Sequence, residues 1–98
     1  MNILLVNDDG YKAEGFIELK HALEKKGHLV TAVSTDEDVS SSGSGYNMLR
    51  KWIVSVHRDS GMPIFVLQQG TPIDCIDLGE NLMNITNNQI DLVLVGIN

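Results

Sequence analysis

The first third of the chain alternates short apolar runs with one amphipathic segment. Residues 3–6 and 29–33 are largely apolar runs of the kind found in strands that are covered on both faces. Between them, apolar residues recur every three or four positions over residues 14–26, and Gly27 follows as a C-cap signal, which predicts a helix. A strand, a helix of this length and a second strand together predict a right-handed parallel crossover.

Turn-forming residues divide the rest of the chain. Residues 34–47 are rich in Ser, Gly and Asp, which predicts a loop. Residues 52–56 and 64–67 are two apolar runs separated by a turn that contains glycine, which is typical of an antiparallel hairpin. Residues 92–95 form the last apolar run and predict a strand.

A second helix is predicted to begin at Thr71-Pro72. Thr71 suits the N-cap, Pro72 suits the first helical position, and Asp74 completes a weak capping box. Gly79 lies on the apolar stripe of this helix, where it allows close approach to a sheet. The full order predicts an α/β fold: a Rossmann-like, mostly parallel sheet with flanking helices and a β-hairpin insertion.

The paired acids Asp8 and Asp9 are the leading candidates for chemistry. They follow the first predicted strand and precede Gly10, and ligands of such sheets bind beyond the carboxyl ends of the strands. Adjacent carboxylates repel each other unless a cation or a proton intervenes, and their oxygens favour hard cations such as Mg²⁺, Mn²⁺ or Ca²⁺. The alternative is that both are solvated turn residues, because Asp-Asp-Gly is common in turns.

Three further segments bring polar groups to the same edge of the predicted sheet. The Ser- and Gly-rich residues 40–45 follow the second strand, and residues 96–98 place the amide of Asn98 after the last strand. The start of the second helix at Thr71 offers free N–H groups to an anion. The alternatives are a plain surface loop and a helix cap without a ligand.

Charge and composition narrow the classes of function. The net charge is −6 and no basic patch is visible, which argues against a duplex nucleic-acid partner. No apolar run approaches the roughly 20 residues that span a bilayer, so we expect a cytoplasmic protein without a membrane partner. Cys75 is the single cysteine and is expected to be a buried, reduced thiol. An acidic protein that handles phosphate commonly uses a bound cation to offset the repulsion.

Three segments carry motifs that occur in order across the 98 residues. Residues 1–10 read Met-Asn-Ile-Leu-Leu-Val-Asn-Asp-Asp-Gly, residues 69–75 read Gln-Gly-Thr-Pro-Ile-Asp-Cys, and residues 91–98 read Asp-Leu-Val-Leu-Val-Gly-Ile-Asn. Together they resemble the opening, the internal Gly-Thr-Pro-x-Asp-Cys signature and the Gly-Ile-Asn strand of the survival protein E family, the stationary-phase nucleotidases.

The resemblance implies a metal-dependent phosphomonoesterase, a hydrolase of the 5′-nucleotidase or acid-phosphatase type. Its substrates would be nucleoside 5′- and 3′-monophosphates, and its cofactor one divalent cation, Mg²⁺ or Mn²⁺, with Ca²⁺ as a substitute in crystals. Carried over residue by residue, the resemblance makes Asp8 and Asp9 catalytic, gives a metal-ligand set of Asp8, Asp9, Ser40 and Asn98, and gives substrate contacts at Asn7, Ser41, Gly43 and Thr71.

The chain departs from the family pattern around its second strand. Ser34-Thr35-Asp36 stands where the family has Ala-Pro-Asp, and Val39 replaces a polar residue. The Ser-rich run over residues 40–45 is also altered, so Ser41 and Ser42 stay open as alternatives to Ser40.

Family size implies that residues 1–98 are the N-terminal part of a single α/β phosphatase domain whose C-terminal part is missing. A homodimer or homotetramer would form mainly through that missing part. One alternative is a catalytically inactive, truncated fragment that binds metal or a partner. A second is a signalling receiver domain, which also pairs acids after its first strand; here Gly96 occupies the position of the phosphoacceptor Asp and cannot accept a phosphoryl group.

Overall fold

Five strands and two helices make up the described part of the protein, residues 1–35, 53–68 and 71–95 of a computed structural model. In chain order they are β1 (Asn2–Asn7), α1 (Glu14–Lys25), β2 (Leu29–Thr35), β3 (Ile53–His57), β4 (Ile64–Gln68), α2 (Pro72–Ile85) and β5 (Leu92–Val95). All seven elements predicted from the sequence are present, and where the sequence predicted an end it differs by at most two residues.

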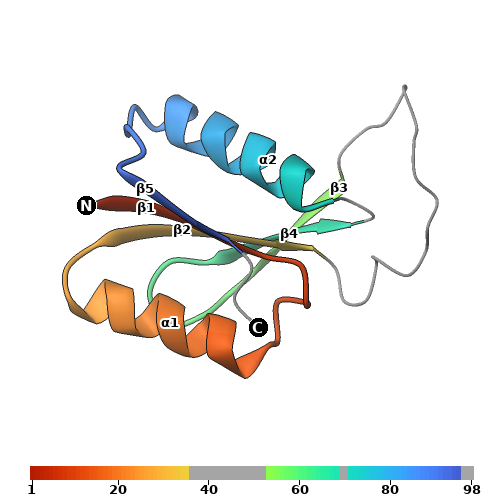
Figure 1. The fold of residues 1–98 in the computed structure, drawn as a ribbon, viewed down its shortest axis with the longest axis horizontal. Coiled ribbons are helices and arrows are strands. Elements are labelled where there is room, and N and C mark those ends of the chain that lie inside the picture. The colour runs from red at the N-terminus through yellow and green to blue at the C-terminus, as the bar shows by residue number, and fades with distance from the viewer. Residues whose placement is uncertain (36–52, 69–70, 96–98) are drawn as a thin grey trace.

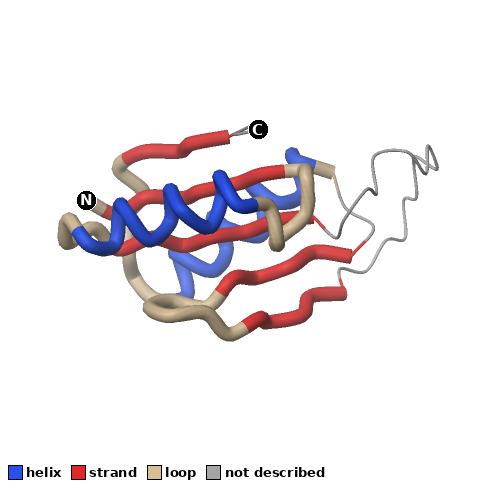
Figure 2. Tube along the Cα trace, turned by 90° about the horizontal axis from the view of Figure 1, so that it is seen from below, coloured by secondary structure: helices blue, strands red, loops and turns tan. Residues whose placement is uncertain are grey.

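The strands form one sheet in the order β3-β4-β2-β1-β5. β1, β2, β4 and β5 are parallel, and β3 pairs antiparallel with β4 as the predicted hairpin. Helix α2 covers one face of the sheet and α1 the other (Figure 1). Seen from below, α1 crosses in front of the strands and α2 behind them (Figure 2). The α/β, Rossmann-like prediction with a hairpin insertion is therefore confirmed.

The predicted loop over residues 34–47 is wrong at its start. Ser34 and Thr35 belong to β2, where Ser34 lies opposite Asn7 of β1 and Thr35 lies opposite Leu67 of β4. Polar residues suggested a loop, but pairing with strands on both sides extends β2 by two residues. Residues 36–47 lie outside the described residues.

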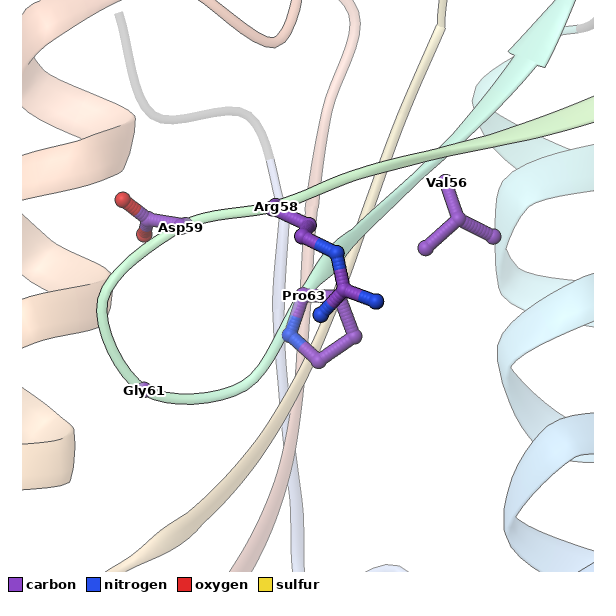
Figure 3. A pocket seen from close by; sticks show the side chains of 5 residues that line it. All are labelled: Val56, Arg58, Asp59, Gly61 and Pro63. Carbon is purple, nitrogen blue, oxygen red and sulfur yellow. The ribbon is translucent and has the colours of Figure 1, made fainter.

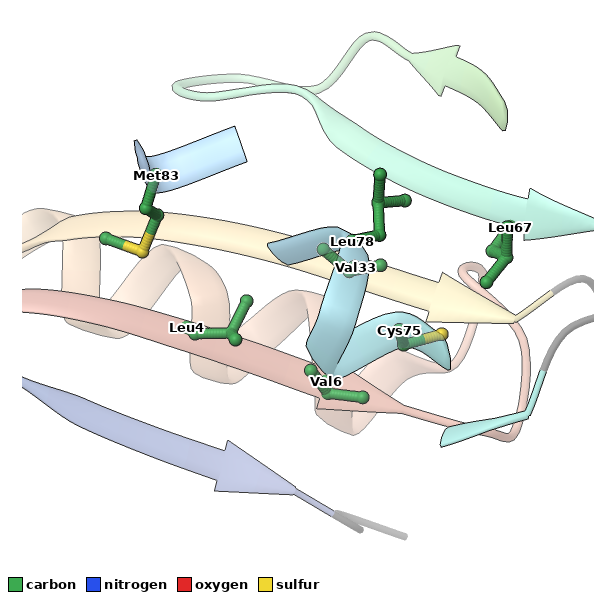
Figure 4. Packing of buried hydrophobic residues seen from close by; sticks show 7 residues of the cluster. All are labelled: Leu4, Val6, Val33, Leu67, Cys75, Leu78 and Met83. Atoms are coloured by element: carbon green, nitrogen blue, oxygen red, sulfur yellow. The ribbon is translucent and has the colours of Figure 1, made fainter. Parts of the chain in front are cut away.

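The centre of the sheet is buried on both faces. Leu4 and Val6 of β1 pack with α2, in a cluster completed by Val33, Leu67, Cys75, Leu78 and Met83 (Figure 4). Leu5 faces the other way, into a cluster that contains Phe16 of α1. This two-sided burial explains the continuous apolar run at residues 3–6, since neither face of β1 meets water.

Gly79 allows α2 to lie close to the sheet, as predicted. A methyl group built at its Cα would lie 2.3 Å from Leu4 Cδ1 and 3.1 Å from Leu4 Cγ. Leu4 is fully buried in the cluster between β1 and α2. The helix therefore approaches β1 at a distance that only glycine permits.

Buried Lys20 anchors the β3–β4 turn to α1. Its side chain is 0% exposed, and its ammonium donates to Glu24 Oε1 (3.1 Å), Asp59 Oδ2 (2.9 Å) and the Ser60 carbonyl oxygen (3.4 Å). All three N–H groups of the ammonium are thus used. The second Glu24 oxygen accepts the backbone N–H of Met62 at 2.9 Å, so helix and turn are joined from both sides.

Strand β5 lies at the edge of the sheet and is only partly covered. Leu92, Val93 and Val95 are 39%, 40% and 47% exposed, although β5 pairs fully with β1 along its inner side. In the described part of the chain no strand pairs with its outer side. Among these same residues, neither helix is long and apolar enough to cross a bilayer.

Replacing Gly79 with alanine tests the close packing of α2. The added methyl group overlaps Leu4, so we expect Gly79→Ala to destabilise the fold by about 1–3 kcal/mol despite the better helix propensity of alanine. Gly15→Ala in α1 is the matched control, because nothing lies within 4 Å of its Cβ position. The control should gain up to about 1 kcal/mol. Urea unfolding measures both, and equal effects would contradict the packing described here.

The Lys20–Asp59 ion pair predicts an acid-dependent loss of stability. Burial raises the pKa of Asp59, but hydrogen bonds and positive charge from Lys20 and His21 outweigh burial and lower the pKa below the ordinary value of an aspartate. A lowered pKa contributes stability above the unfolded pKa of about 3.9, and this contribution disappears as the pH falls through the folded pKa. Asp59→Asn should therefore cost about 2 kcal/mol at pH 6 and progressively less towards pH 3.

The matched control for this pH series is Asp77→Asn, which removes the same charge at an exposed position on α2. Its effect on the free energy of unfolding should be small. Urea unfolding of the three proteins at each pH gives the comparison. A cost of Asp59→Asn that does not shrink on acidification would show that the ion pair contributes nothing.

Candidate functional site

The paired acids lie at the tip of the most buried strand. β1 ends at Asn7, Asp8 is partly exposed, and Asp9 is exposed. Gly10 then turns the chain towards α1 with a φ of +95°, a left-handed conformation that favours glycine. The two carboxylates thus emerge from the core at the carboxyl edge of the sheet, next to the ends of β2 and β5.

The strand order reverses at β1: β2 and β4 are added on one side of it and β5 on the other. Such a reversal point marks the binding region in folds of this kind. From β1 the chain passes through α1 to β2 on one side, and α2 later brings it back across the other face to β5. Ligands of open α/β sheets bind at such reversal points, beyond the carboxyl ends of the strands. The register places Val6 of β1 opposite Val95, the last residue of β5.

Asn7 braces the turn that carries the acids. Its side chain is fully buried, its Nδ2 donates to the Gly10 carbonyl oxygen (3.2 Å), and its Oδ1 accepts from Ser34 Oγ (2.6 Å). The carboxamide therefore ties the Asp8–Gly10 turn to the end of β2. That Asn7 also contacts phosphate stays a prediction, but its contacts here are with the protein itself.

Asp8 lies within electrostatic reach of the first turn of α2. Burial raises the pKa of the Cys75 thiol to about 12, and the negative charges of Asp74 and Asp8 add to the rise. Cys75 is fully buried in the core, so the thiol stays protonated and unreactive. The predicted buried, reduced state of Cys75 fits this geometry. Asp8 follows Val6 by two residues, and Val6 packs in the cluster under α2, so alternation along the strand puts Asp8 on the α2 side of the sheet.

The N-terminus of α2 is closed by its own side chains. Thr71 Oγ1 accepts the backbone N–H of Asp74 (3.2 Å), and Asp74 Oδ2 accepts the backbone N–H of Thr71 (3.0 Å), which completes the predicted capping box. Pro72 has no N–H to offer. Much of the donor capacity that would bind an anion at this helix start is thus already used. The substrate contact predicted for Thr71 stays a prediction.

The remaining predicted site residues lie outside the described residues. They are Ser40, Ser41, Gly43 and Asn98. Within residues 1–35, 53–68 and 71–95, no three His, Cys, Asp or Glu side chains form a group that could hold a metal ion. The described residues supply two carboxylates, and the hydroxyl and amide ligands predicted from the sequence come from the segments that follow β2 and β5.

Sequence reasoning missed Ser34 and Thr35 as residues of this edge. Both were assigned to the loop, yet both are buried at the end of β2, beside the turn that carries the acids. Their position directly after the apolar residues 29–33 could have indicated that the parallel strand continues through them to its carboxyl end.

A pocket of about 290 Å³ lies elsewhere, at the β3–β4 turn, lined by Val56, Arg58, Asp59, Gly61 and Pro63. Arg58 extends over Pro63, whereas Asp59 points towards α1 (Figure 3). Ser60 Oγ and Asp59 Oδ2 both approach the same nitrogen, Nε2 of His21, at 3.2 and 2.7 Å. A Ser-His-Asp relay needs the two ring nitrogens to serve different partners, so this cluster is structural.

Fold and strand-end acids together define a doubly wound α/β protein whose candidate site is the carboxyl end of β1. Comparison with known proteins identifies the family to which the chain belongs. The family model described as survival protein SurE matches residues 3–98. The chain belongs to this family, as its three motifs predicted.

Individual relatives agree with this assignment. The chain is 39% identical over 98 residues to the "5'-nucleotidase SurE" of Haemophilus ducreyi and 40% identical over 101 residues to that of Prochlorococcus marinus. Each match covers the whole chain but only 37% and 36% of the relative. A crystal structure of the SurE protein from Aquifex aeolicus matches with a TM-score of 0.70 and 34% identity, over 100% of this chain and 38% of that one. The chain thus spans little more than a third of these relatives.

Removing the Ser34 hydroxyl tests the brace at Asn7. Ser34→Ala leaves Asn7 Oδ1 buried without that donor, so we expect a loss of about 1–3 kcal/mol in unfolding free energy. The turn should also loosen, and amide hydrogen exchange at Ala13, whose N–H donates to the Gly10 carbonyl oxygen, should accelerate.

Ser55→Ala is the matched control, since Ser55 also bonds a side chain, His57 Nε2, but within β3. It should leave exchange at Ala13 unchanged. Equal exchange at Ala13 in the parent and in Ser34→Ala would show that the hydroxyl does not support the turn.

Proposed function

We propose that this chain carries the carboxylate half of a divalent-metal site, and that its protein hydrolyses nucleoside 5′- and 3′-monophosphates to nucleoside and phosphate. The observation that carries the proposal is the position of Asp8 and Asp9 at the carboxyl end of buried β1, the point at which the strand order of the sheet reverses. Relatives that match the whole chain bear the name 5'-nucleotidase, which supports the substrate class.

The donor chemistry fits a hard divalent cation, Mg²⁺ or Mn²⁺. Carboxylate, hydroxyl and amide oxygens are the ligands such cations prefer. In this proposal Asp8 and Asp9 hold the cation, and Ser40 and Asn98 complete the ligand set. Asn98 follows Val95 by three residues, a reach of at most about 10 Å, and Val95 lies opposite Val6 at the tip of β1.

The cation, when bound, neutralises charge on the phosphoryl group and positions the attacking group. The residues of the chain have separate tasks. Asp8 and Asp9 keep the cation at the sheet edge, and the Asn7–Ser34 brace fixes the turn that presents them. In this proposal backbone N–H groups at Ser41 and Gly43 would contact phosphate oxygens, and the start of α2 at Thr71 would add only the donors that its capping box leaves free.

The chain has a net charge of −6, and the proposed substrate is also an anion. A bound cation would offset the repulsion between them. Lys12, whose ammonium lies 5.6 Å from the centre of the Tyr11 ring, is the first positive residue after the acids along the chain. Without a cation, two carboxylates at the site would repel the phosphate group.

Loss of one acid should abolish turnover. Asp9→Asn should lower the rate of phosphate release from a nucleoside 5′-monophosphate in the presence of Mn²⁺ by at least about 100-fold, since changes beyond the direct ligands already cost about 10–100-fold. Asp77→Asn on the exposed face of α2 removes the same charge and should leave the rate unchanged. Chelation of the metal should stop release by the parent and by Asp77→Asn.

Calorimetric titration of the 98-residue chain with Mn²⁺ accompanies this assay. Binding that depends on Asp9, without phosphate release, would identify the chain as an inactive fragment that retains the metal site. Phosphate release that persists in chelator would contradict the metal-dependent proposal.

A further inference from the structure

Thr35 carries a buried hydroxyl without a partner at the edge of the sheet. The residue is 2% exposed, and its Oγ1 has no hydrogen-bond partner among the described residues. A buried polar group left without a partner costs about 1–3 kcal/mol, and native proteins keep few of them. Such a group at the rim of a candidate site points to a ligand or an ordered water.

The sheet places this hydroxyl beside Asp8. Ser34 lies opposite Asn7 in the register of β2 and β1, so Thr35 and Asp8 are the next residues along the two adjacent chains. Side chains alternate along a strand, and Val33 and Val6, two residues earlier, both belong to the cluster under α2. Thr35 therefore faces the α2 side, the side on which Asp8 acts on the Cys75 thiol.

We propose that Thr35 is a further residue of the metal site, whose hydroxyl accepts a hydrogen bond from a water bound to the cation that Asp8 and Asp9 hold. The inference rests on the proposed function, since it presupposes that cation. Mg²⁺ and similar cations keep several waters, whose polarised hydrogens need acceptors, and a threonine hydroxyl offers two lone pairs. Thr35 acts through that water and is a positioning residue.

Two hydroxyl residues, Ser34 and Thr35, follow one another at the end of β2. The two hydroxyls serve opposite faces of β2: Ser34 supports the turn through Asn7, and Thr35 faces the cation side.

The test is Thr35→Val, which keeps the shape of the side chain and removes the hydroxyl. Two quantities are measured on the 98-residue chain: the thermal midpoint without metal, and the dissociation constant of Mn²⁺ by calorimetry. The variant should melt about 4 °C or more above the parent, because an unpaired buried hydroxyl is gone. It should bind Mn²⁺ about tenfold more weakly, because a contact to the hydration shell is lost.

Two matched variants separate this effect from others. Thr31→Val makes the same change in the same strand, nearer its amino end, where Thr31 pairs with Leu4; Mn²⁺ affinity should not change. Thr35→Ser keeps the hydroxyl and should retain most of the affinity. Thr35→Val should therefore raise the stability of the metal-free protein and lower its affinity for Mn²⁺. This combination is expected only if the hydroxyl faces the ligand.

Each other outcome overturns the proposal. A lower midpoint for Thr35→Val shows that the hydroxyl is bonded within the fold. An unchanged Mn²⁺ affinity while Asp9→Asn abolishes binding shows that the metal site is intact without Thr35, and weaker binding of inorganic phosphate alone then assigns Thr35 to the substrate. Absence of Mn²⁺ binding by the parent refutes the metal site itself, and the Thr35 proposal with it.

Discussion

Burial of β1 on both faces is the constraint on which the rest of this structure depends. Its four apolar residues, Ile3 to Val6, are at most 1% exposed, so the strand needs a helix on each side and a paired strand at each edge. α1 and α2 meet the first need, and β2 and β5 meet the second. With β1 fixed in this way, the residues that follow it must emerge at the carboxyl edge of the sheet, and those residues are the two acids.

Three buried polar side chains at the margins of this core differ in how far their hydrogen-bonding groups are satisfied. Lys20 uses all three N–H groups of its ammonium, and so joins α1 to the β3–β4 turn. Asn7 uses both ends of its carboxamide, and so joins the acidic turn to β2. Thr35 alone of these has an unpartnered polar atom in the described structure, and it is the one that lies beside a candidate ligand position. The hydrogen bonds of Lys20 and Asn7 hold elements of the fold together, whereas the unpartnered hydroxyl of Thr35 is the basis of its proposed role at the metal site.

Electrostatics favour the same edge as the binding region. Asp8 and Asp74 both act on the buried Cys75 thiol, which shows that negative charge accumulates where β1 ends and α2 begins. The capping box of α2 already uses Asp74 to satisfy backbone N–H groups. Asp8 and Asp9 are left at the accessible rim, and the divalent cation proposed above would relieve their repulsion and make the rim attractive to a phosphate group.

Local sequence determined most of the elements and the position of the acids. Apolar runs, helix periodicity, the Thr71-Pro72-Ile73-Asp74 cap and the β3–β4 turn depend on neighbouring residues, so they could be predicted, as could the emergence of Asp8 and Asp9 from a buried strand. Tertiary structure alone decided that Ser34 and Thr35 extend β2, that Asn7 braces the acidic turn, and that Lys20 is buried. Each of those outcomes depends on a partner 27 or more residues away, or on strands that pair from both sides, and such partners leave no periodic signal in the chain.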